Sequence, residues 1–540
     1  MADTTFSSGT VVQSSWLNDV NRFVYDAQTA GAAKGAFLVK FLNSATGGAG
    51  RTAQDKLKDV VDVKDFGAST SGDATTAFQN ALNAVSALGG GIVEFSENYS
   101  ILNNLSVPDY CSLVGRLQSP GSLQDGGVGG NYDAYGSTLK VASTATITLN
   151  KGSALMNCLV IRSGLDLPFA NLAAAQAGVP LFAGTAVTVA GDDAKVDSVL
   201  FLGFAKAIFS NNRARMRFNN VQGDCTNGIE VANALDVIYI SNCHFWPFTT
   251  ANYSWTASDT TQLILTRSGI AIHLSARTDW PQITNCFSYG YYRGIRTVSM
   301  GSARISDCAV DGPVSGGVTV HSGSIGMLFE GTFADNSIQN SYVAGKSSGY
   351  YYSGTSGYSC MTCCDAVACT IGHDIQGAVD VLIQNGLMRA CSYPFQIGNA
   401  SAAVHIVGSR TRETITKPFN VSVAAAKIYT KDLDFDAPSG GAAVVQGAAN
   451  WVLPSVASAD PLNLPGHAGD MFNVTGTTGF GTLNGGYPGR TVTLIFAGVL
   501  NVLNGGNMRL NGATTFATAA GRTLKLTYDG STWREVGRCT

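Results

Sequence analysis

Charged residues are scarce in this chain: Lys, Arg, Asp and Glu make up 13% of its 540 residues, against roughly 25% in an ordinary globular protein. The net charge of −3 argues against nucleic acid as a partner, because phosphate binding needs a basic surface. No apolar run reaches the ~20 residues that a membrane span requires. Neither a phosphate loop, a nucleophile elbow nor a His-rich metal motif is present. We therefore expect no metal and no cofactor.

Glycine and small β-forming residues are abundant instead. The chain holds 63 glycines and is 45% hydrophobic, which favours β structure with many turns and a large core. Twelve cysteines are present, but the start MADTTFSSGT has no basic or apolar region typical of a secretory signal. Reduced thiols are therefore expected. The spacing of Cys363, Cys364 and Cys369 to His373 does not match a zinc site.

An internal repeat is the strongest pattern. Eight four-residue segments align, and their starts differ by 41, 22, 22, 43, 22, 33 and 45 residues. We interpret these gaps as one or two units of about 22, with an insertion of about eleven after Cys308. The segments are Leu155–Cys158, Val196–Val199, Phe218–Val221, Ile240–Cys243, Ile283–Cys286, Ile305–Cys308, Ile338–Ser341 and Ile383–Gly386.

The four positions of the repeat differ in character. The first is always apolar, the third is Asn in six segments, and the fourth is small. Alternation of this kind is typical of a strand that ends at a bend. A period near 22 suits one turn of a solenoid made of three short strands. Stacked turns would align the Asn side chains in a hydrogen-bonded column, and the fourth-position cysteines would fill the core.

The composition divides the chain into three parts. Residues 1–55 are predicted to be an N-terminal attachment segment with a linker, with apolar residues at helical spacing in Trp16–Tyr25. Residues 56–435 contain the repeat, and a helix near residue 80 is expected to cap its open end. Residues 436–540 show alternating segments between Gly/Asn turns, which predicts a small antiparallel β domain.

Three stretches in chain order resemble a known family. Val63–Ala68 with Gly72-Asp73, Thr76–Leu82 and Gly89–Phe95 resembles the start of pectate-lyase-like right-handed parallel β-helices. The segment SWLNDVNRFVYDA resembles the virion-attachment ends of bacteriophage tailspikes. The stretches Tyr487–Leu494 and Tyr528–Val536 resemble tailspike C-terminal β domains.

The resemblance implies an all-β homotrimer on a phage tail. It would be made in the host cytoplasm, joined to the virion or to another tailspike by its N-terminal segment, and would bind and depolymerise a bacterial capsule or O-antigen. The C-terminal domain would serve trimerisation or glycan binding.

Hydrolysis of a glycan needs an acid and an opposing base or nucleophile, ~6.5–9.5 Å apart in an inverting enzyme. Asp236 and Asp279 each lie six residues before an Asn of the column, and those Asn are 43 residues apart. If 43 residues make two turns, the two carboxylates share a column about 9–10 Å apart. Both Asp residues can also be simple turn caps.

Further candidates surround this pair. Glu230 and Asp311 are additional carboxylates, Asp307 occupies the Asn position and so also suits a structural role, and His244 could face outward as a base. Aromatic faces stack on sugars, and Arg holds acidic sugars by charge-assisted hydrogen bonds. The substrate-binding candidates are Trp246, Trp280, Tyr291, Tyr292, Arg277, Arg293 and Arg296. Trp246 and Trp280 could instead pack between chains.

Two alternatives to a hydrolase stay open. A polysaccharide lyase would abstract a proton beside a uronic carboxylate with His244, a Tyr or a Lys as base, while an Arg or a cation neutralises the acid. A non-enzymatic adhesin would bind the glycan without releasing reducing ends. The fold alone does not decide among the three.

Overall fold

The structure is a computed structural model. None of its described helices is long and apolar enough to cross a membrane. The predicted Trp16–Tyr25 helix and the boundary at 436–441 lie almost entirely outside the described residues. The structure describes residues 60–117, 136–250, 265–315, 318–319, 321–413, 416, 419–423, 426–431, 433–435, 455–464 and 471–539, with short pieces at 14–15, 18, 40–42 (β1, Lys40–Leu42) and 50–52 (β2, Gly50–Thr52).

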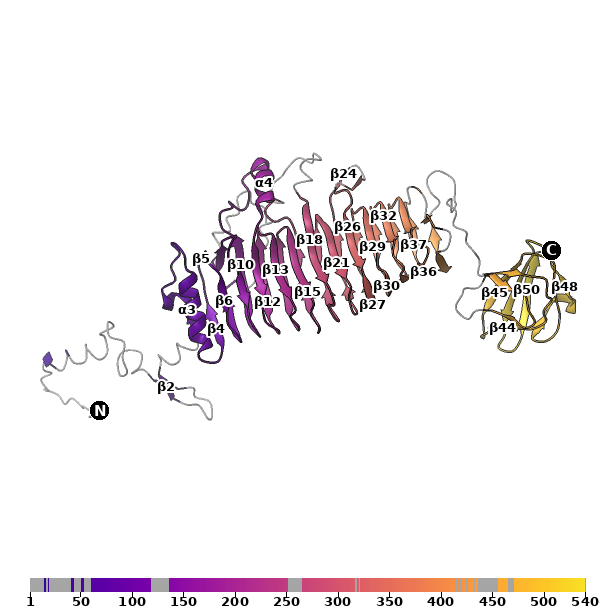
Figure 1. The fold of residues 1–540 in the computed structure, drawn as a ribbon, viewed down its shortest axis with the longest axis horizontal. Helices are drawn as coiled ribbons and strands as arrows, with labels where there is room; N and C mark the ends of the chain where they lie inside the picture. Colours follow the sequence, from indigo (N-terminus) through magenta and orange to yellow (C-terminus); the bar gives the residue numbers. More distant parts are fainter. Residues whose placement is uncertain are drawn as a thin grey trace, which may run out of the picture.

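The central body is a parallel β-helix, as predicted (Figure 1). Each complete turn carries one strand on a first face, a bend, one strand on a second face, a corner, and one strand on a third face. The first-face strands include β3 (Val61–Asp62), β4 (Gly91–Glu94), β7 (Cys111–Val114), β16 (Tyr239–Ser241), β19 (Gln282–Thr284), β22 (Arg304–Ser306), β27 (Thr332–Gln339), β30 (Ser356–Thr362), β33 (Asp380–Gln384), β36 (Ala403–Val407) and β39 (Lys427–Lys431).

Three long strands run through the bend and serve both faces: β10 (Ala154–Arg162), β12 (Lys195–Leu202) and β14 (Arg217–Asp224). The other second-face strands are β5 (Asn98–Ile101), β8 (Thr138–Val141), β17 (His244–Phe245), β20 (Phe287–Tyr289), β23 (Ala309–Asp311), β28 (Tyr342–Ala344), β31 (Asp365–Val367), β34 (Leu387–Arg389), β37 (Arg410–Arg412) and β40 (Asp434–Phe435).

The third face is one sheet of twelve parallel strands. They are β6 (Leu105–Val107), β9 (Ile147–Leu149), β11 (Thr185–Val189), β13 (Lys206–Asn211), β15 (Asn227–Ala232), β18 (Arg267–Ser275), β21 (Tyr291–Val298), β26 (Ile325–Glu330), β29 (Ser348–Tyr352), β32 (Ile371–Ile375), β35 (Tyr393–Ile397) and β38 (Phe419–Val421).

The eight repeat segments stack in register, since each first-position residue pairs with the equivalent residue of a neighbouring turn. One further turn, Met361–Cys364, lies between the last two segments and breaks the pattern with Cys363 in the Asn position. The gap of 45 therefore covers two turns. The gaps of 41 and 43 do not, because Leu155 pairs directly with Val196 and Ile240 with Ile283. In both places one turn carries a long insertion.

Backbone geometry explains the Asn column. Every third-position residue of the repeat has a positive φ, such as 57° at Asn242, 51° at Asn285 and 55° at Asp307. Asn and Asp tolerate this left-handed conformation better than other residues with a Cβ atom. The side chains also link turns: Asn285 Nδ2 donates to Asn242 Oδ1 at 2.8 Å. The position therefore selects for both conformation and hydrogen bonding.

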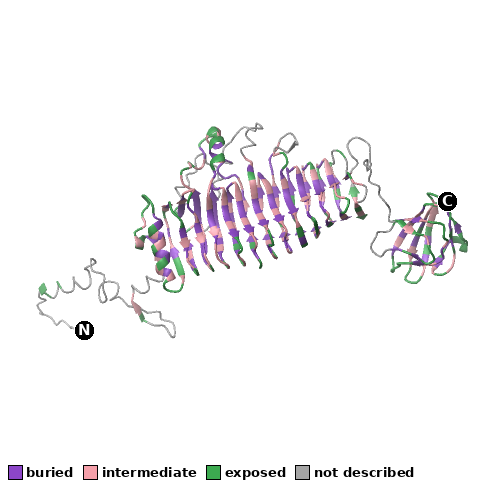
Figure 2. Cartoon of the chain, in the orientation of Figure 1, coloured by how far each residue is buried: buried purple, intermediate pink, exposed green. Residues whose placement is uncertain are grey.

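The interior of the coil is filled by inward-facing apolar side chains, so that burial concentrates along the strands (Figure 2). The fourth-position cysteines belong to this core, as predicted: Cys158, Cys243, Cys286 and Cys308 are buried, and all twelve cysteines are free. Burial raises the pKa of the Cys158 thiol. These thiols act as small apolar fillers.

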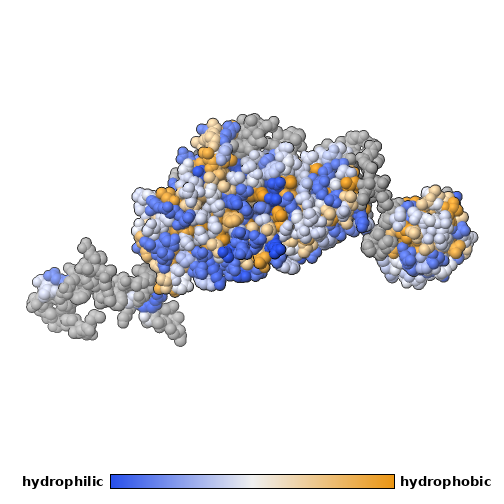
Figure 3. Space-filling model, viewed as in Figure 1, coloured by the Kyte–Doolittle hydropathy of each residue, from blue (hydrophilic) through white to orange (hydrophobic). Residues whose placement is uncertain are grey.

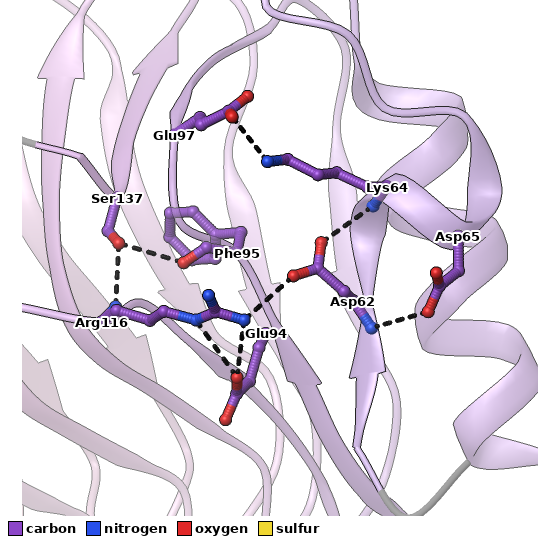
Figure 4. Close-up of polar contacts among 8 residues, drawn as sticks. All are labelled: Asp62, Lys64, Asp65, Glu94, Phe95, Glu97, Arg116 and Ser137. Carbon is purple, nitrogen blue, oxygen red and sulfur yellow. Dashed lines mark hydrogen bonds and ion pairs between the residues drawn. The ribbon is translucent and has the colours of Figure 1, made fainter. Parts of the chain in front are cut away.

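Helix α3 (Thr75–Ser86) covers the N-terminal end of the coil, where it buries Phe78, Leu82 and Val85 (Figure 1). Beside it, the short helix η3 (Val63–Phe66) follows β3. Arg116 ties the first turns together, since its guanidinium lies 3.2 Å from both the Asp62 and the Glu94 carboxylates (Figure 4). The cap thus closes an edge that would otherwise expose unpaired backbone groups.

Three long insertions leave the coil at the same corner, between the second and third faces. The first holds α4 (Leu172–Gly178) and η5 (Val179–Leu181), the second spans residues 246–266, and the third holds the hairpin of β24 (Val314–Ser315) and β25 (Val318–Thr319). Helix α4 and β24 lie along one edge of the coil in Figure 1. Leu167 of the first insertion and Trp246 and Phe248 of the second pack with the outward residues Leu159 and Leu200 of the second face.

The C-terminal residues 455–539 form a separate core around Trp533 and Phe472. The predicted antiparallel sheet holds for β45, β49 and β50, whereas β41, β43 and β45 are parallel, as are β47 and β50. The elements are β41 (Ser455–Ala457), β42 (Leu462–Asn463), β43 (Met471–Thr475), β44 (Leu483–Asn484), β45 (Thr491–Phe496), β46 (Asn501–Val502), β47 (Met508–Arg509), η6 (Asn511–Ala513), β48 (Phe516–Ala517), β49 (Thr523–Tyr528) and β50 (Trp533–Cys539). The Gly/Asn turns in the sequence predict reversals but do not specify strand direction.

Candidate functional site

The outward side chains of the second face form two parallel columns, which we call the outer ladder. Side chains in each column sit on consecutive turns, about 4.8 Å apart. The first column contains Leu159, Leu200, Gln222, His244, Phe287, Ala309, Tyr342, Asp365, Leu387, Arg410 and Asp434; the second contains Ile161, Leu202, Asp224, Trp246, Tyr289, Asp311, Ala344, Val367, Arg389 and Arg412. The ladder changes from apolar through acidic to basic along the coil.

The apolar part of the ladder is covered by the insertion that follows β17. Trp246 packs on Tyr289 with ring centroids 4.5 Å apart, and His244 lies 5.3 Å from Phe248 and 5.2 Å from Phe287. Burial lowers the pKa of His244. His244 is therefore enclosed by rings, which does not suit the base role predicted for it. Trp246 is partly buried and forms an aromatic wall with Tyr289.

A buried ion pair fixes this insertion to the coil. Asp224 accepts hydrogen bonds from Arg267 Nε at 2.7 Å and from the Thr249 backbone N–H at 2.8 Å. The Arg267 and Asp224 side chains are 1% and 0% exposed. Buried charges are tolerated only when paired and hydrogen-bonded. The pair thereby holds the two ends of the insertion next to the aromatic wall.

Two carboxyl groups occupy the middle of the ladder. Asp311 follows Tyr289 in the second column, and Asp365 follows Tyr342 in the first. Burial raises the pKa of both carboxyls. Tyr342 stands between them, and its pKa is raised by burial and by the charges of Asp311 and Asp365, while Arg389 opposes this. Raised carboxyl pKa values on an outward face are typical of acid–base sites.

A buried lysine lies beneath the acidic part. Lys346 Nζ donates to the Tyr291 carbonyl at 2.7 Å. Burial lowers its pKa to about 8, although the Asp311 charge raises it. His321 lies close to Tyr292, with ring centroids 5.0 Å apart, and burial lowers the His321 pKa to about 4. Lys346 thus places positive potential near Asp311.

The basic end of the ladder borders a cavity of about 560 Å³. It is lined by the bend residues Cys363, Asn385 and Gly408 and by Asp365 and Arg410 of the outer ladder. The remaining lining residues are Gly386, Leu387 and Arg412. The face of the coil visible in Figure 3 mixes hydrophilic and hydrophobic side chains. The cavity thus has a carboxyl group on one side and guanidinium groups on the other.

The predicted Asp236 and Asp279 pair lies elsewhere, at the corner that precedes the first face. The predicted separation of two turns is wrong, because Tyr239 pairs with Gln282 on the next turn, so these 43 residues make a single turn. Equivalent backbone positions are then only about 5 Å apart. Asp236 accepts a backbone hydrogen bond from Val237 and contacts Arg215 at 3.2 Å, and both lower its pKa.

Other predicted residues belong to the outward side of the third face. Glu230 pairs with Lys206 at 2.7 Å and Arg296 with Glu330 at 2.5 Å. Arg293 stacks over Tyr292, with its guanidinium carbon 4.9 Å from the ring. The third face meets the second face only at the corner, so Glu230 and Arg296 do not lie beside the Asp311 and Asp365 carboxyl groups of the outer ladder.

Four further predicted residues, Tyr291, Asp307, Trp280 and Arg277, lie outside the outer ladder. Tyr291 is wrong as a sugar contact, because it points inward and is fully buried. Asp307 occupies a left-handed bend and accepts from Asn340 Nδ2 at 3.3 Å, which is the structural role. Trp280 is 53% exposed beside Arg304, and Arg277 is exposed at the same corner as Asp279. Of the predicted catalytic residues, only Asp311 is one of the two carboxyl groups in the middle of the outer ladder.

The thiols near His373 form no metal centre. His373 is fully buried between the rings of Tyr350 and Phe395, at 4.8 and 5.6 Å, and burial lowers its pKa to about 3. Throughout the described ranges, no group of three His, Cys, Asp or Glu side chains is placed to hold a metal ion.

Four residues of the outer ladder are not among the predicted site residues: Asp365, Tyr342, Arg389 and Arg410. The signal that could have found them is a fixed offset: ladder residues lie two and four positions after each bend residue. Asp311 lies four after Asp307, and Asp365 two after Cys363. The turn at Cys363 does not show in the repeat pattern because Cys replaces Asn there.

The chain is similar to known proteins in its fold. No family model matches the chain, and no curated protein matches it. Similar solved structures include phage tailspikes and polysaccharide-active β-helix enzymes. The Acinetobacter phage vb_AbaP_AS12 gp42 tailspike has 11% identity and a TM-score of 0.42, over 89% of this chain and 81% of that chain. The bacteriophage CBA120 tailspike protein 3 has 12% identity and a TM-score of 0.39, over 84% and 72%.

A third similar structure is the GH87 alpha-1,3-glucanase of Streptomyces thermodiastaticus, with 12% identity and a TM-score of 0.42 over 74% of this chain and 71% of that chain. Identities this low transfer no residue role. Each role proposed below is therefore based on the outer ladder of this chain.

Proposed function

We propose that the protein is a glycan depolymerase that hydrolyses a bacterial surface polysaccharide on the outer ladder, with Asp311 and Asp365 as the acid–base pair. One observation carries the proposal: two carboxyl groups with raised pKa flank Tyr342 on one outward face. An extended polymer can lie along such a face, where the aromatic wall of Trp246 and Tyr289 offers stacking surfaces at one end.

The two carboxyl groups have different surroundings, which suggests their roles. Asp311 is the more deeply buried, so its carboxyl is favoured in the protonated form that a general acid needs. Asp365 borders the open cavity, where it accepts from the Leu387 backbone N–H at 2.9 Å. In the proposed reaction Asp311 protonates the glycosidic oxygen while Asp365 removes a proton from the attacking water.

The register favours inversion of the anomeric centre. Asp311 and Asp365 lie two turns apart and in neighbouring columns. Their backbones are then roughly 12 Å apart. A separation of two turns is nearer to the ~6.5–9.5 Å of an inverting pair than to the ~5–5.5 Å of a retaining pair, which needs adjacent turns. A water molecule fits in the longer gap.

A lyase mechanism is the second candidate, favoured by the nearness of Tyr342 to Arg389. Elimination needs a base beside a group that neutralises the uronate. The raised pKa of Tyr342 opposes its ionisation, and His244, the other candidate base, is enclosed by aromatic rings. We therefore propose hydrolysis first. Elimination would leave an unsaturated sugar that absorbs in the near ultraviolet, and hydrolysis would not.

The test measures reducing ends released from a panel of purified capsular and O-antigen polysaccharides. Asp311→Asn and Asp365→Asn should each lower the rate roughly 100- to 10,000-fold, the usual contribution of an acid or base. Asp307→Asn is the matched control, because it makes the same chemical change at a bend where Asn is the usual residue. It should keep full activity.

Three results would overturn the proposal in distinct ways. Undiminished release by the Asp311 and Asp365 variants would remove these residues from the mechanism. Products that absorb in the near ultraviolet would establish a lyase. Binding of a panel polysaccharide with no release by the unaltered protein would establish an adhesin.

We also propose that the protein acts as a homotrimer on a phage tail. The resemblance of Trp16–Tyr25 to virion-attachment ends supports the location. The C-terminal unit exposes several large apolar side chains that association of copies would bury: Met471, Tyr487, Val499, Leu503 and Val536. Light scattering of the full chain tests the trimer, and a monomer at micromolar concentration would contradict it.

A further inference from the structure

The cavity at the basic end of the outer ladder is lined by opposite charges. Asp365 lies on its acidic side, and Arg410 and Arg412 lie on the other side. Arg389 belongs to the same column as Arg412 and pairs with it on the next turn. Three guanidinium groups thus gather within two turns of the coil. Only 13% of the residues of this chain are charged, so three arginines on two adjacent turns are an unusual concentration of positive charge.

Protein carboxylates balance the charges of these arginines only in part, because Asp434 lies on the turn next to both Arg410 and Arg412. Arg412 pairs with Asp434 at 2.5 Å. Among the described residues, Arg389 and Arg410 make no side-chain hydrogen bond or ion pair. Arg389 and Arg412 lie on adjacent strands about 4.8 Å apart, and like charges at directly opposite positions destabilise a sheet. An anion placed between the guanidinium groups would relieve this repulsion.

We infer that this cavity binds a carboxylate of the polymer, so that the substrate is an acidic polysaccharide. The inference rests on the proposed function for the location of the glycan. Arg presents a planar fork of N–H groups that matches a carboxylate. Arg410 lies two turns beyond Asp365 in the same column, about 10 Å along the coil axis. An acidic sugar in the cavity would therefore be anchored beside the reacting bond and not at it.

An exposed thiol in the cavity lining supplies a direct reporter of occupancy. Cys363 is exposed and lines the cavity, whereas Cys539 is exposed on β50 of the C-terminal unit. A ligand in the cavity should slow alkylation of Cys363 and leave Cys539 unchanged. The rate at each thiol is measured by mass spectrometry of peptides from the intact full-length protein. This readout needs no catalytic turnover.

The probes are oligogalacturonate and the same oligomer after chemical reduction of its carboxyl groups, in which each carboxylate is replaced by a neutral hydroxymethyl group. Oligogalacturonate should protect Cys363, and the reduced oligomer should not. Protection should weaken as salt is raised from 0.05 to about 0.5 M, because ions screen charge. Arg410→Gln and Arg389→Gln should each require roughly 10- to 100-fold more oligogalacturonate for equal protection, the range for a lost hydrogen bond to a charged group. Arg304→Gln, beside Trp280 on another surface, is the matched control.

The outcomes separate this inference from the proposed function. Equal protection by both oligomers, no protection by either, or protection unchanged in the Arg410 and Arg389 variants would overturn the acidic-ligand inference. In those cases hydrolysis of a neutral panel polysaccharide that depends on Asp311 would still uphold the proposed function. Charge-dependent protection together with full activity of Asp311→Asn would uphold the anion site and overturn the proposed chemistry.

Discussion

Removing one partner of the buried Arg267–Asp224 pair should be among the most destabilising single changes on the second face. In Arg267→Met, Asp224 loses hydrogen bonds of 2.7 and 3.0 Å and keeps those from Thr249. The remaining carboxylate is fully buried. Leaving such a charge without its partner costs about 3–5 kcal/mol. We expect that loss in the free energy of unfolding.

The double variant Asp224→Asn/Arg267→Met tests the reason for the loss. It removes both charges, while the Asn carbonyl still accepts from Thr249. It should therefore be more stable than Arg267→Met alone. Lys206→Met is the control for a half-buried ion pair, because Lys206 and Glu230 are 32% and 21% exposed. That change should cost about 1 kcal/mol or less.

The assay is urea unfolding of the full-length protein at pH 7, followed by tryptophan fluorescence, with the unfolding rate in urea as a second measure. The unaltered protein and the three variants are compared. Only Arg267→Met leaves a buried charge without its partner, so only this variant should lose a large part of the free energy of unfolding. Arg267→Met losing no more stability than Lys206→Met would refute the reasoning. So would a double variant less stable than Arg267→Met, since the cost would then come from packing and not from charge.

Three further predictions concern single positions. Asn285→Ala should lose about 2 kcal/mol in urea unfolding, because it forfeits the bond to Asn242 and strains a φ of 51°, whereas Asn285→Gly should lose roughly half as much. Burial raises the pKa of Asp311 in the folded protein, so the Asp311 carboxyl contributes its full stabilisation only below the unfolded pKa of about 3.9, and this stabilisation is lost as pH rises through the folded pKa. Asp311→Asn should therefore be more stable than the unaltered protein at pH 7 but not at pH 3. An equal difference in stability at both pH values would contradict the raised pKa. Tyr291→Phe should keep full depolymerase activity while Tyr291→Ala loses about 3–5 kcal/mol of stability, and loss of activity in the Phe variant would restore Tyr291 as a sugar contact.

Much of the fold could be predicted because its repeat has a local chemical cause. A left-handed bend in every turn selects Asn, and a core of stacked side chains selects an apolar residue two positions earlier, as in Ile283 and Asn285. Both requirements recur at each turn, so they appear in the sequence as a local pattern that can be recognised without knowing any long-range contact. Cys363 shows the limit, since a bend held by a different residue disappears from the pattern.

The site could not be predicted as well, because turn number does not follow from residue number. Insertions add residues without adding a turn, so Asn242 and Asn285 are neighbours despite a separation of 43. The distance between two carboxylates depends on that count. Asp311 and Asp365 are placed on one face only by their offsets of four and two residues from the bend residues Asp307 and Cys363. These offsets can be used only if the bend residue of every turn is known. Burial adds a second difficulty: alternation alone does not tell that Tyr291 points inward.

The placement of the three insertions has a consequence for how such a protein can change. All of them leave the coil where the second face ends, at a corner whose left-handed residues in other turns, such as Gly290, Gly345 and Ala368, are not the Asn of the bend. Residues can be gained or exchanged there while the strands above and below keep their partners. The rim beside the outer ladder is thus free to be remodelled for a different polymer, and the coil that supports it need not be redesigned each time.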